Sequence, residues 1–204
     1  MKILWGIIII FLTSFSSRKQ LVPNNKTNYL QESIETQDKY TKYDSLFNKY
    51  KEFIVTDFGF PVGKPNAKGY YNAQKFKENN HLGDDWNGVS GGNSDLGDTI
   101  YSIANGYVSF AENIGGGWGN VIRVIHKYEG NYYESVYAHC RTIKVKEGDL
   151  VKKGISIGTI GTANGQYLAH LHLELRDDIF MDIGGGYSKN TKGYLDPTKF
   201  INEN

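Results

Sequence analysis

Two hydrophobic patterns divide the chain. Between about residues 31 and 54, aromatic side chains recur at steps of three and four positions, namely Tyr40, Tyr43, Phe47 and Tyr50. This spacing places them on one face of a helix, so we expect an amphipathic helix that packs against the rest of the chain or links to it. From about residue 55 onward, short apolar runs alternate with glycine-rich turns, which is typical of β-strands.

The strand-rich part of the sequence predicts antiparallel hairpins. The expected hairpins and strands are 99–103 with 107–111 around Asn105-Gly106, 121–126 with 132–139 around Glu129-Gly130-Asn131, then 155–161 and 171–175. Asn-Gly is a strong signal for a two-residue hairpin turn. Parallel strands would need long crossover connections, which are usually helical, and this part of the sequence contains no such segment. We therefore expect a mainly β fold, a small antiparallel β-sheet sandwich, preceded by an N-terminal helix.

The N-terminus has the pattern of a secretory signal. Lys2 precedes an apolar run from Ile3 to Leu12, small polar residues follow, and charge returns at Arg18. The run is shorter than the about 20 apolar residues that span a bilayer. We expect a signal peptide at 1–17, a tether and amphipathic helix at 18–54, and the main domain at 55–204. If the signal is not cleaved, it would act as a membrane anchor.

This signal predicts secretion across the inner membrane, to the periplasm, the cell envelope or the exterior. A lipoprotein anchor is not expected, because no cysteine follows the apolar run. The 204 residues carry a net charge of +1 with both signs mixed along the chain, so nothing points to nucleic acid. The single cysteine, Cys140, excludes an internal disulfide and a multi-thiolate zinc site. Any metal must therefore be bound by His, Asp or Glu.

The five histidines are the main candidates for chemistry. On a strand, residues two apart face the same way, so His170 and His172 would share a face while Leu171 points into the core. If the segment from His81 is also extended, Asp85 lies on the side of His81 and Asp84 on the other. His81, Asp85 and one histidine of the His170/His172 pair would supply three zinc ligands and leave the fourth position for water.

The remaining histidines have different expected roles. His139 ends a strand and could act as a general base or stabilise an oxyanion. Its neighbour Cys140 would face the opposite side, so we expect a buried, inert thiol rather than a thiol protease. His126 follows an apolar strand, and we interpret it as structural.

Three short motifs occur in order: His81-x-Gly83-x-Asp85, Tyr137-x-His139 and His170-x-His172. Together they resemble the lysostaphin-type, LytM-like zinc endopeptidases of peptidoglycan. The segments between the motifs, at 98–108, 119–122 and 148–154, also resemble that family, and the similarity extends over about residues 55–200. One such motif is weak, but three in this order are specific.

This resemblance implies both residue roles and a reaction. His81, Asp85 and His172 would bind one Zn²⁺ per chain, and His139 and His170 would be catalytic. The family fold implies a small antiparallel β architecture with a metal-lined groove. The implied activity is hydrolysis of amide bonds in bacterial peptidoglycan stem peptides or cross-bridges by metal-activated water.

Two insertions depart from the family pattern, at 86–96 and 182–193, and we expect both to edge the groove. One alternative function is a catalytically inactive relative that binds wall or regulates another hydrolase. Another is a biotinyl or lipoyl carrier, because 145–161 is rich in turns and contains Lys152 and Lys153. A carrier function would not explain the four histidines of the three motifs, His81, His139, His170 and His172.

Overall fold

The computed structural model describes residues 39–204, so the expected signal peptide and the first part of the tether lie outside the described residues. The chain divides into a unit Met1–Asp44 and a unit Ser45–Asn204. Residues 39–49 are helical, as the aromatic spacing predicts. Within residues 39–204 no helix is both long and apolar enough to cross a membrane.

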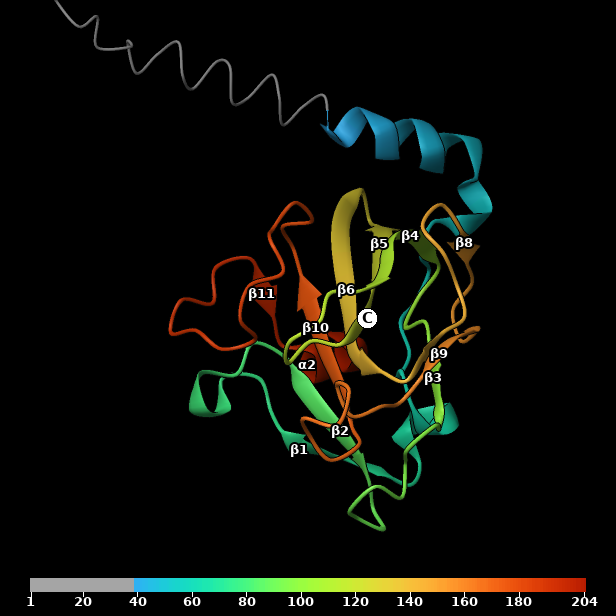
Figure 1. The fold of residues 1–204 in the computed structure, drawn as a ribbon. Coiled ribbons are helices and arrows are strands. Elements are labelled where there is room, and N and C mark those ends of the chain that lie inside the picture. The colour runs from blue at the N-terminus through green and yellow to red at the C-terminus, as the bar shows by residue number, and fades with distance from the viewer. Residues whose placement is uncertain (1–38) are drawn as a thin grey trace, which may run out of the picture. The chain divides into compact units, whose positions relative to one another are not determined.

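The second unit is built mainly from β-strands (Figure 1). Its strands are β1 (Tyr70–Gln74), β2 (Asp84–Gly88), β3 (Thr99–Tyr101), β4 (Gly106–Asn113), β5 (Asn120–Tyr128), β6 (Asn131–Cys140), β7 (Thr142–Ile143), β8 (Leu150–Val151), β9 (Ser156–Thr159), β10 (Leu171–Arg176) and β11 (Tyr194–Leu195). Its helical segments are the short turns η1 (Lys51–Phe53), η2 (Gly63–Ala67) and η3 (Glu78–Asn80), and the C-terminal helix α2 (Pro197–Glu203).

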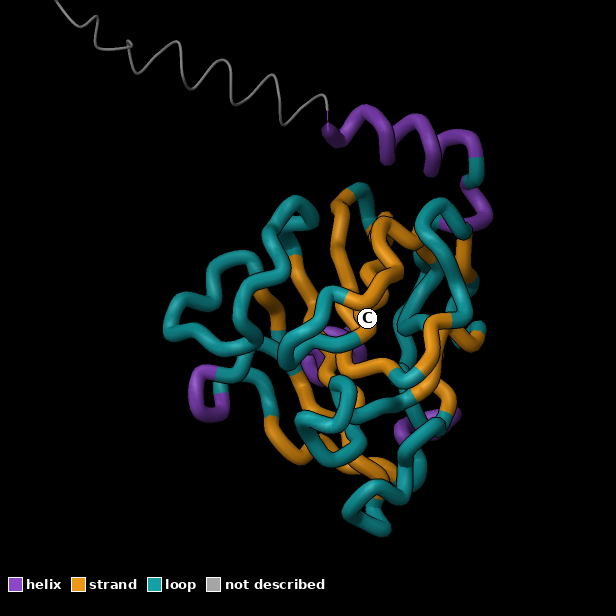
Figure 2. Tube along the Cα trace, viewed as in Figure 1, coloured by secondary structure: helices purple, strands orange, loops and turns teal. Residues whose placement is uncertain are grey.

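All strand pairs are antiparallel, which confirms the predicted fold class. The larger sheet has the order β1-β2-β10-β6-β5-β4-β8, with β11 pairing to β10, and the smaller sheet has the order β3-β9-β7. One apolar core contains residues of both sheets, including Ile100 and Ile157 from the smaller one and Ile122 and Leu173 from the larger one. Figure 2 shows that long loops connect these short strands.

The two hairpin predictions have different outcomes. The hairpin of β5 and β6 is confirmed, with Tyr128 opposite Asn131 and positive φ at both Glu129 and Gly130. The hairpin around Asn105-Gly106 is wrong, because β3 pairs with β9 while β4 pairs with β5 and β8. A type I′ turn needs positive φ at both central residues, and neither residue of this pair is among the positive-φ residues.

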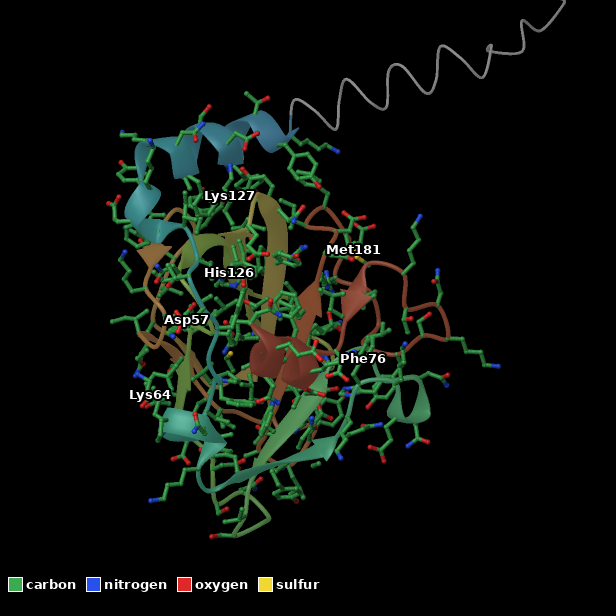
Figure 3. All side chains as sticks on the ribbon, turned by 180° about the vertical axis from the view of Figure 1, so that it is seen from behind. Asp57, Lys64, Phe76, His126, Lys127 and Met181 are labelled. Atoms are coloured by element: carbon green, nitrogen blue, oxygen red, sulfur yellow. The ribbon has the colours of Figure 1, made fainter. Side chains whose placement is uncertain are left out.

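Asp84 faces away from the predicted metal ligands and fixes the end of the chain. Its Oδ1 accepts a hydrogen bond from the Phe76 backbone N–H (3.0 Å), and its Oδ2 accepts from the backbone N–H and hydroxyl of Thr198. Asp196 caps the same helix by accepting from the Lys199 N–H. Two donors in the first turn of α2 are thus satisfied by carboxylates. Figure 3 shows this face of the molecule, with Phe76 labelled near α2.

His126 lies in a buried polar network, in agreement with its structural interpretation. Its Nδ1 lies 2.8 Å from the carbonyl of Asn105 and its Nε2 lies 2.7 Å from the hydroxyl of Ser135. The Ser135 hydroxyl oxygen lies 3.0 Å from the phenol oxygen of Tyr137, which accepts a hydrogen bond from the Ile103 N–H. Because His126 is fully buried, burial disfavours the imidazolium and lowers its pKa to about 4.

This shift predicts an acid-dependent loss of stability. Between about pH 6.5 and pH 4 the unfolded chain protonates this histidine while the folded chain does not, so the free energy of unfolding falls as pH falls. In His126→Gln this contribution is absent. We expect the stability advantage of the wild type over the variant to shrink by roughly 2 kcal/mol between pH 7 and pH 5. Urea unfolding of both proteins at pH 7 and pH 5 measures this difference in the free energy of unfolding. The same change with pH in both proteins would contradict the prediction.

Candidate metal centre and groove

The pairing of β2 with β10 brings together residues that lie far apart in the sequence. His172 is directly opposite Asp85, and Leu171 is opposite Trp86. Because side chains alternate across a strand, His172 and Asp85 share one face while Leu171 enters the core, where it is fully buried. On its other side β10 pairs with β6, and His172 is opposite Ala138, the residue before His139.

His81 approaches the same point from the segment before β2. Its backbone is extended, with φ −62° and ψ 137°, and it forms a β-bridge with Tyr187. Gly83 allows this segment to run close to β10, because a Cβ there would lie 2.3 Å from the Leu173 carbonyl oxygen. The prediction that His81 and Asp85 lie together and Asp84 apart is therefore confirmed by the geometry.

The three predicted ligands converge on one point. His172 Nδ1 lies 2.9 Å from Asp85 Oδ1 and 2.9 Å from His81 Nε2, and His81 Nε2 lies 3.3 Å from Asp85 Oδ1. Tetrahedral zinc ligands about 2.1 Å from the ion lie about 3.4 Å from one another. Among residues 39–204, only this set of His, Cys, Asp and Glu side chains has the spacing of a metal site. Two imidazoles and one carboxylate suit Zn²⁺.

Electrostatics keep this cluster suited to a cation. Burial opposes ionisation of Asp85, but hydrogen bonds from His172 and His81 outweigh it and hold the pKa of the carboxyl well below its usual range. Burial also opposes the charged form of His172, but hydrogen bonds to Asp85 and Glu174 outweigh it and raise its pKa to about 9. The site thus holds an ionised carboxylate in a buried position.

His139 and His170 lie beside the cluster and are oriented by backbone carbonyls. His139 Nδ1 lies 3.3 Å from the Trp118 carbonyl, and His170 Nδ1 lies 2.8 Å from the Leu168 carbonyl. A carbonyl only accepts, so each Nδ1 carries a proton and donates it. The two rings lie 4.7 Å apart, and His170 Nε2 is 3.8 Å from Asp85 Oδ1.

The backbone and the charge state of His139 are both unusual. Its φ is +60°, a conformation that is uncommon for a residue other than glycine and that is concentrated at functional sites. Burial and the neighbouring His172 and His170 lower its pKa to about 3. His139 is therefore neutral, and able to accept a proton, at neutral pH. Its neighbour Cys140 is buried, and burial raises the pKa of the thiol to about 12, as expected of an inert cysteine.

A groove of about 510 Å³ opens onto these residues. It is lined by Gln74, Asp85, Gly117, Trp118, His139, Tyr167, His170, His172, Gly185, Gly186 and Tyr187. The insertion at 182–193 edges the groove, as predicted, through Gly185, Gly186 and Tyr187. The insertion at 86–96 does not contribute to the lining, and that expectation is wrong.

Sequence reasoning missed several residues of this site. Glu174 contacts His172 and lies two positions further along the same strand, so strand alternation could have identified it. Trp118 lies against the His172 ring, with centroids 5.4 Å apart, and Tyr187 lies 5.1 Å from the His81 ring. Both come from loops, and no periodic pattern indicates them.

A protein-family comparison agrees with this geometry. The model of Peptidase family M23 matches residues 84–186, which is half of the chain. The chain belongs to Peptidase family M23. The matched part contains two of the three expected metal ligands and both expected catalytic histidines, and His81 lies three residues before it begins.

Several curated relatives of this M23 chain match it over a segment of 80 residues. Lipoprotein NlpD of Yersinia enterocolitica is 40% identical over 39% of this chain and 78% of its own length. The murein hydrolase activator NlpD of Escherichia coli is 39% identical over 39% of this chain but only 20% of its own length. The chain therefore corresponds to one part of the longer relatives.

Solved structures show the same M23 fold. The antimicrobial peptidase lysostaphin from Staphylococcus simulans aligns with 72% of this chain and 55% of its own chain, at 22% identity and a TM-score of 0.52. The structure of the SpoIIIAH and SpoIIQ complex aligns with 71% of this chain and 99% of that chain, at 19% identity and a TM-score of 0.54. These two similarities establish the fold.

The two neighbouring aspartates give a sharp test of the metal centre. We expect the purified wild-type protein to carry about one zinc per chain. Asp85→Ala removes the only carboxylate of the cluster, so zinc should be lost. Asp84→Asn keeps one acceptor oxygen beside Thr198, so zinc should stay near one per chain while the free energy of unfolding falls by about 1 to 3 kcal/mol. Elemental analysis after dialysis measures the zinc, and retention by Asp85→Ala would refute this ligand set.

Proposed function

We infer that this M23 protein is a zinc-dependent endopeptidase that hydrolyses amide bonds in peptidoglycan. One observation carries the proposal: the convergence of His81, Asp85 and His172 on one point in an open groove, with His139 and His170 beside it and oriented through their Nδ1 atoms. A purely structural cluster would not need two further oriented histidines next to it.

In this proposal, His81 Nε2, Asp85 Oδ1 and His172 Nδ1 would hold the ion. Bound zinc supplies a Lewis acid and makes water a nucleophile near neutral pH. The imidazoles of His139 and His170 would orient the attacking water, and their Nε2 atoms would accept its proton. Once protonated, the same atom is a donor that stabilises the developing oxyanion or protonates the leaving nitrogen. No covalent intermediate with the protein is required.

Peptidoglycan peptides are the proposed substrate class. Support comes from the M23 family match and from relatives whose names refer to murein hydrolysis. The expected secretion signal would bring the protein to the envelope, where that polymer is found. A peptide bound in the groove would contact Trp118, Tyr167 and the segment from Gly185 to Tyr187, which line it.

A second candidate function is activation of another wall hydrolase. It is favoured by the name of the Salmonella and Escherichia coli relatives, murein hydrolase activator NlpD. In that case the same groove would bind wall or a partner enzyme without cutting a bond. Digestion of purified peptidoglycan by the isolated protein separates the two functions, because an activator alone would release no new amino groups.

Three single substitutions separate binding the metal from using it. His172→Ala removes a ligand, so we expect loss of zinc and of all wall lysis. His170→Ala and His139→Ala should keep zinc and fold but lose about 100- to 10,000-fold in rate, which is the usual cost of one positioned acid–base group. Zinc analysis, circular dichroism and muropeptide mass spectrometry on the same preparations measure the three effects.

Two outcomes would contradict these roles. If His139→Ala released zinc while His172→Ala retained it, the ligand set would be wrong. If all three variants lysed wall like the wild type, the groove would not be the site of hydrolysis. The masses of the released muropeptides also show whether a direct cross-link or a bridge is cut.

A further inference from the structure

A buried pair of charged residues lies directly beneath the metal ligands. Glu174 Oε1 lies 3.3 Å from His172 Nε2, the ring nitrogen that faces away from the cluster. The other oxygen of Glu174 accepts from Nε (2.9 Å) and Nη2 of Arg176. Glu174 and Arg176 are both fully buried. One carboxylate therefore serves a metal ligand with one oxygen and an arginine with the other.

The remaining donors of Arg176 hold the loop that becomes the groove wall. Nη1 donates to the Asp182 carbonyl (3.1 Å), and Nη2 donates to the Ile183 carbonyl (2.8 Å). The next carbonyl, that of Gly184, accepts from the indole N–H of Trp118 (3.1 Å). Successive backbone groups are thus fixed from inside the protein.

Beyond these anchors the loop continues into the groove and returns to the cluster. The Gly186 carbonyl accepts from the Leu82 N–H (2.9 Å), and Tyr187 forms the β-bridge with His81. The Tyr187 hydroxyl donates to Gln74 Oε1 (2.9 Å) at the groove. The wall formed by 185–187 is therefore anchored both to Arg176 and to the segment that carries a metal ligand.

We propose that Glu174 and Arg176 are positioning residues that couple the zinc ligand His172 to the wall of the substrate groove. Glu174 accepts the Nε2 proton of His172 and so leaves Nδ1 as the ring nitrogen that would bind the ion. Arg176, held by the same carboxylate, fixes the carbonyls before 185–187. The proposal rests on the zinc site of the proposed function, and it assigns the loop and the ligand to one buried unit.

The carboxylate is essential to this coupling. A glutamine has one acceptor oxygen, so Glu174→Gln can accept from His172 or from Arg176 but not from both. If its amide N–H₂ faces His172, Nε2 must accept, and the ring proton moves to Nδ1, where it blocks the metal. If the N–H₂ faces Arg176, two donors oppose each other. Either arrangement weakens zinc binding or releases the loop.

Glu134→Gln is a matched control. Glu134 is also buried and does not contact His172, but it lies beside the same arginine: it accepts two hydrogen bonds from Arg123, and its Oε2 lies 3.6 Å from Arg176 Nη1. This variant therefore removes a buried carboxylate near Arg176 and leaves the contact between Glu174 and His172 in place. We expect Glu174→Gln to weaken zinc affinity by about 10- to 100-fold, the usual effect of removing a partner behind a metal ligand. Glu134→Gln should stay close to the wild type. Competition for Zn²⁺ with a chromophoric chelator gives the affinities, and near-ultraviolet circular dichroism checks that each variant is folded.

Glu174→Asp keeps the charge beside Arg176 but shortens the side chain, so it tests the same contact if the glutamine variant does not fold. It should also lose zinc affinity relative to Glu134→Gln. Wild-type affinity in Glu174→Gln, or in Glu174→Asp where the glutamine variant does not fold, or an equal loss in Glu134→Gln, would overturn the role of Glu174. Because the probe is Zn²⁺ alone, this result is independent of whether the protein lyses wall.

The role of Arg176 in fixing the loop before 185–187 is tested by limited proteolysis. Arg176→Lys keeps the charge but lacks the planar fork that reaches Glu174 and two carbonyls together. We expect faster trypsin cleavage after the exposed Lys189 and Lys192, which follow the wall in the same loop. Cleavage is followed by mass spectrometry on folded protein. An unchanged cleavage rate would show that Arg176 does not fix this loop.

Discussion

The register between β2 and β10 is the constraint on which the site depends. With Asp85 opposite His172, two of the proposed ligand atoms lie 2.9 Å apart on the same face of the sheet. Since side chains alternate along a strand, a slip of one residue would turn His172 toward the core and Leu171 toward the groove. Burial of Leu171 and Leu173 opposes that slip, so the apolar core also determines the geometry of the proposed metal site.

The residues around this register reinforce it from both sides. Gly83 lets the chain before β2 lie against the Leu173 carbonyl, where any other side chain would clash. Asp84, on the opposite face from Asp85, accepts three hydrogen bonds from Phe76 and Thr198. The two adjacent aspartates therefore have different roles: Asp84 accepts hydrogen bonds from buried donors and fixes α2, and Asp85 faces the cluster of proposed ligands. The same alternation that separates them was readable in the sequence.

Local patterns predicted the parts of the fold that local physics determines. His170 and His172 share a face of the groove, and Asp84 faces away from Asp85, as the alternation predicts. His81 comes close to Asp85 for a different reason, because the chain bends at Leu82 and Gly83 and does not continue as one extended strand. The Asn105-Gly106 turn failed because its groups are used by distant partners. The Asn105 carbonyl lies 2.8 Å from His126 Nδ1 and its side-chain oxygen accepts from the Lys153 N–H. Those contacts join segments about 20 and 50 residues away, and no short window of sequence contains them.

Long-range contacts also explain why the groove wall escaped prediction. Trp118 and Tyr187 reach the site only because the chain returns to it through loops held by Arg176 and by the backbone near His81. Glu174 was accessible to the alternation argument, since it shares a strand with His172. It went unrecognised because a carboxylate two residues after a ligand has no meaning until its partner Arg176 is seen to be buried beside it.

Strand β10 shows how one short segment can serve stability and chemistry at once. Its six residues are all buried, yet Leu171, Leu173 and Leu175 join the apolar core while His172, Glu174 and Arg176 form a polar row on the other face. Burying charges is costly unless each is paired and hydrogen-bonded. Here Arg176 gains a carboxylate and two carbonyls, and Glu174 gains an arginine and an imidazole. Because few other arrangements satisfy all these groups, the polar row favours a single orientation of His172. An apolar layer of the same volume would pack as well, but it would leave the ring free to turn its other nitrogen toward the groove.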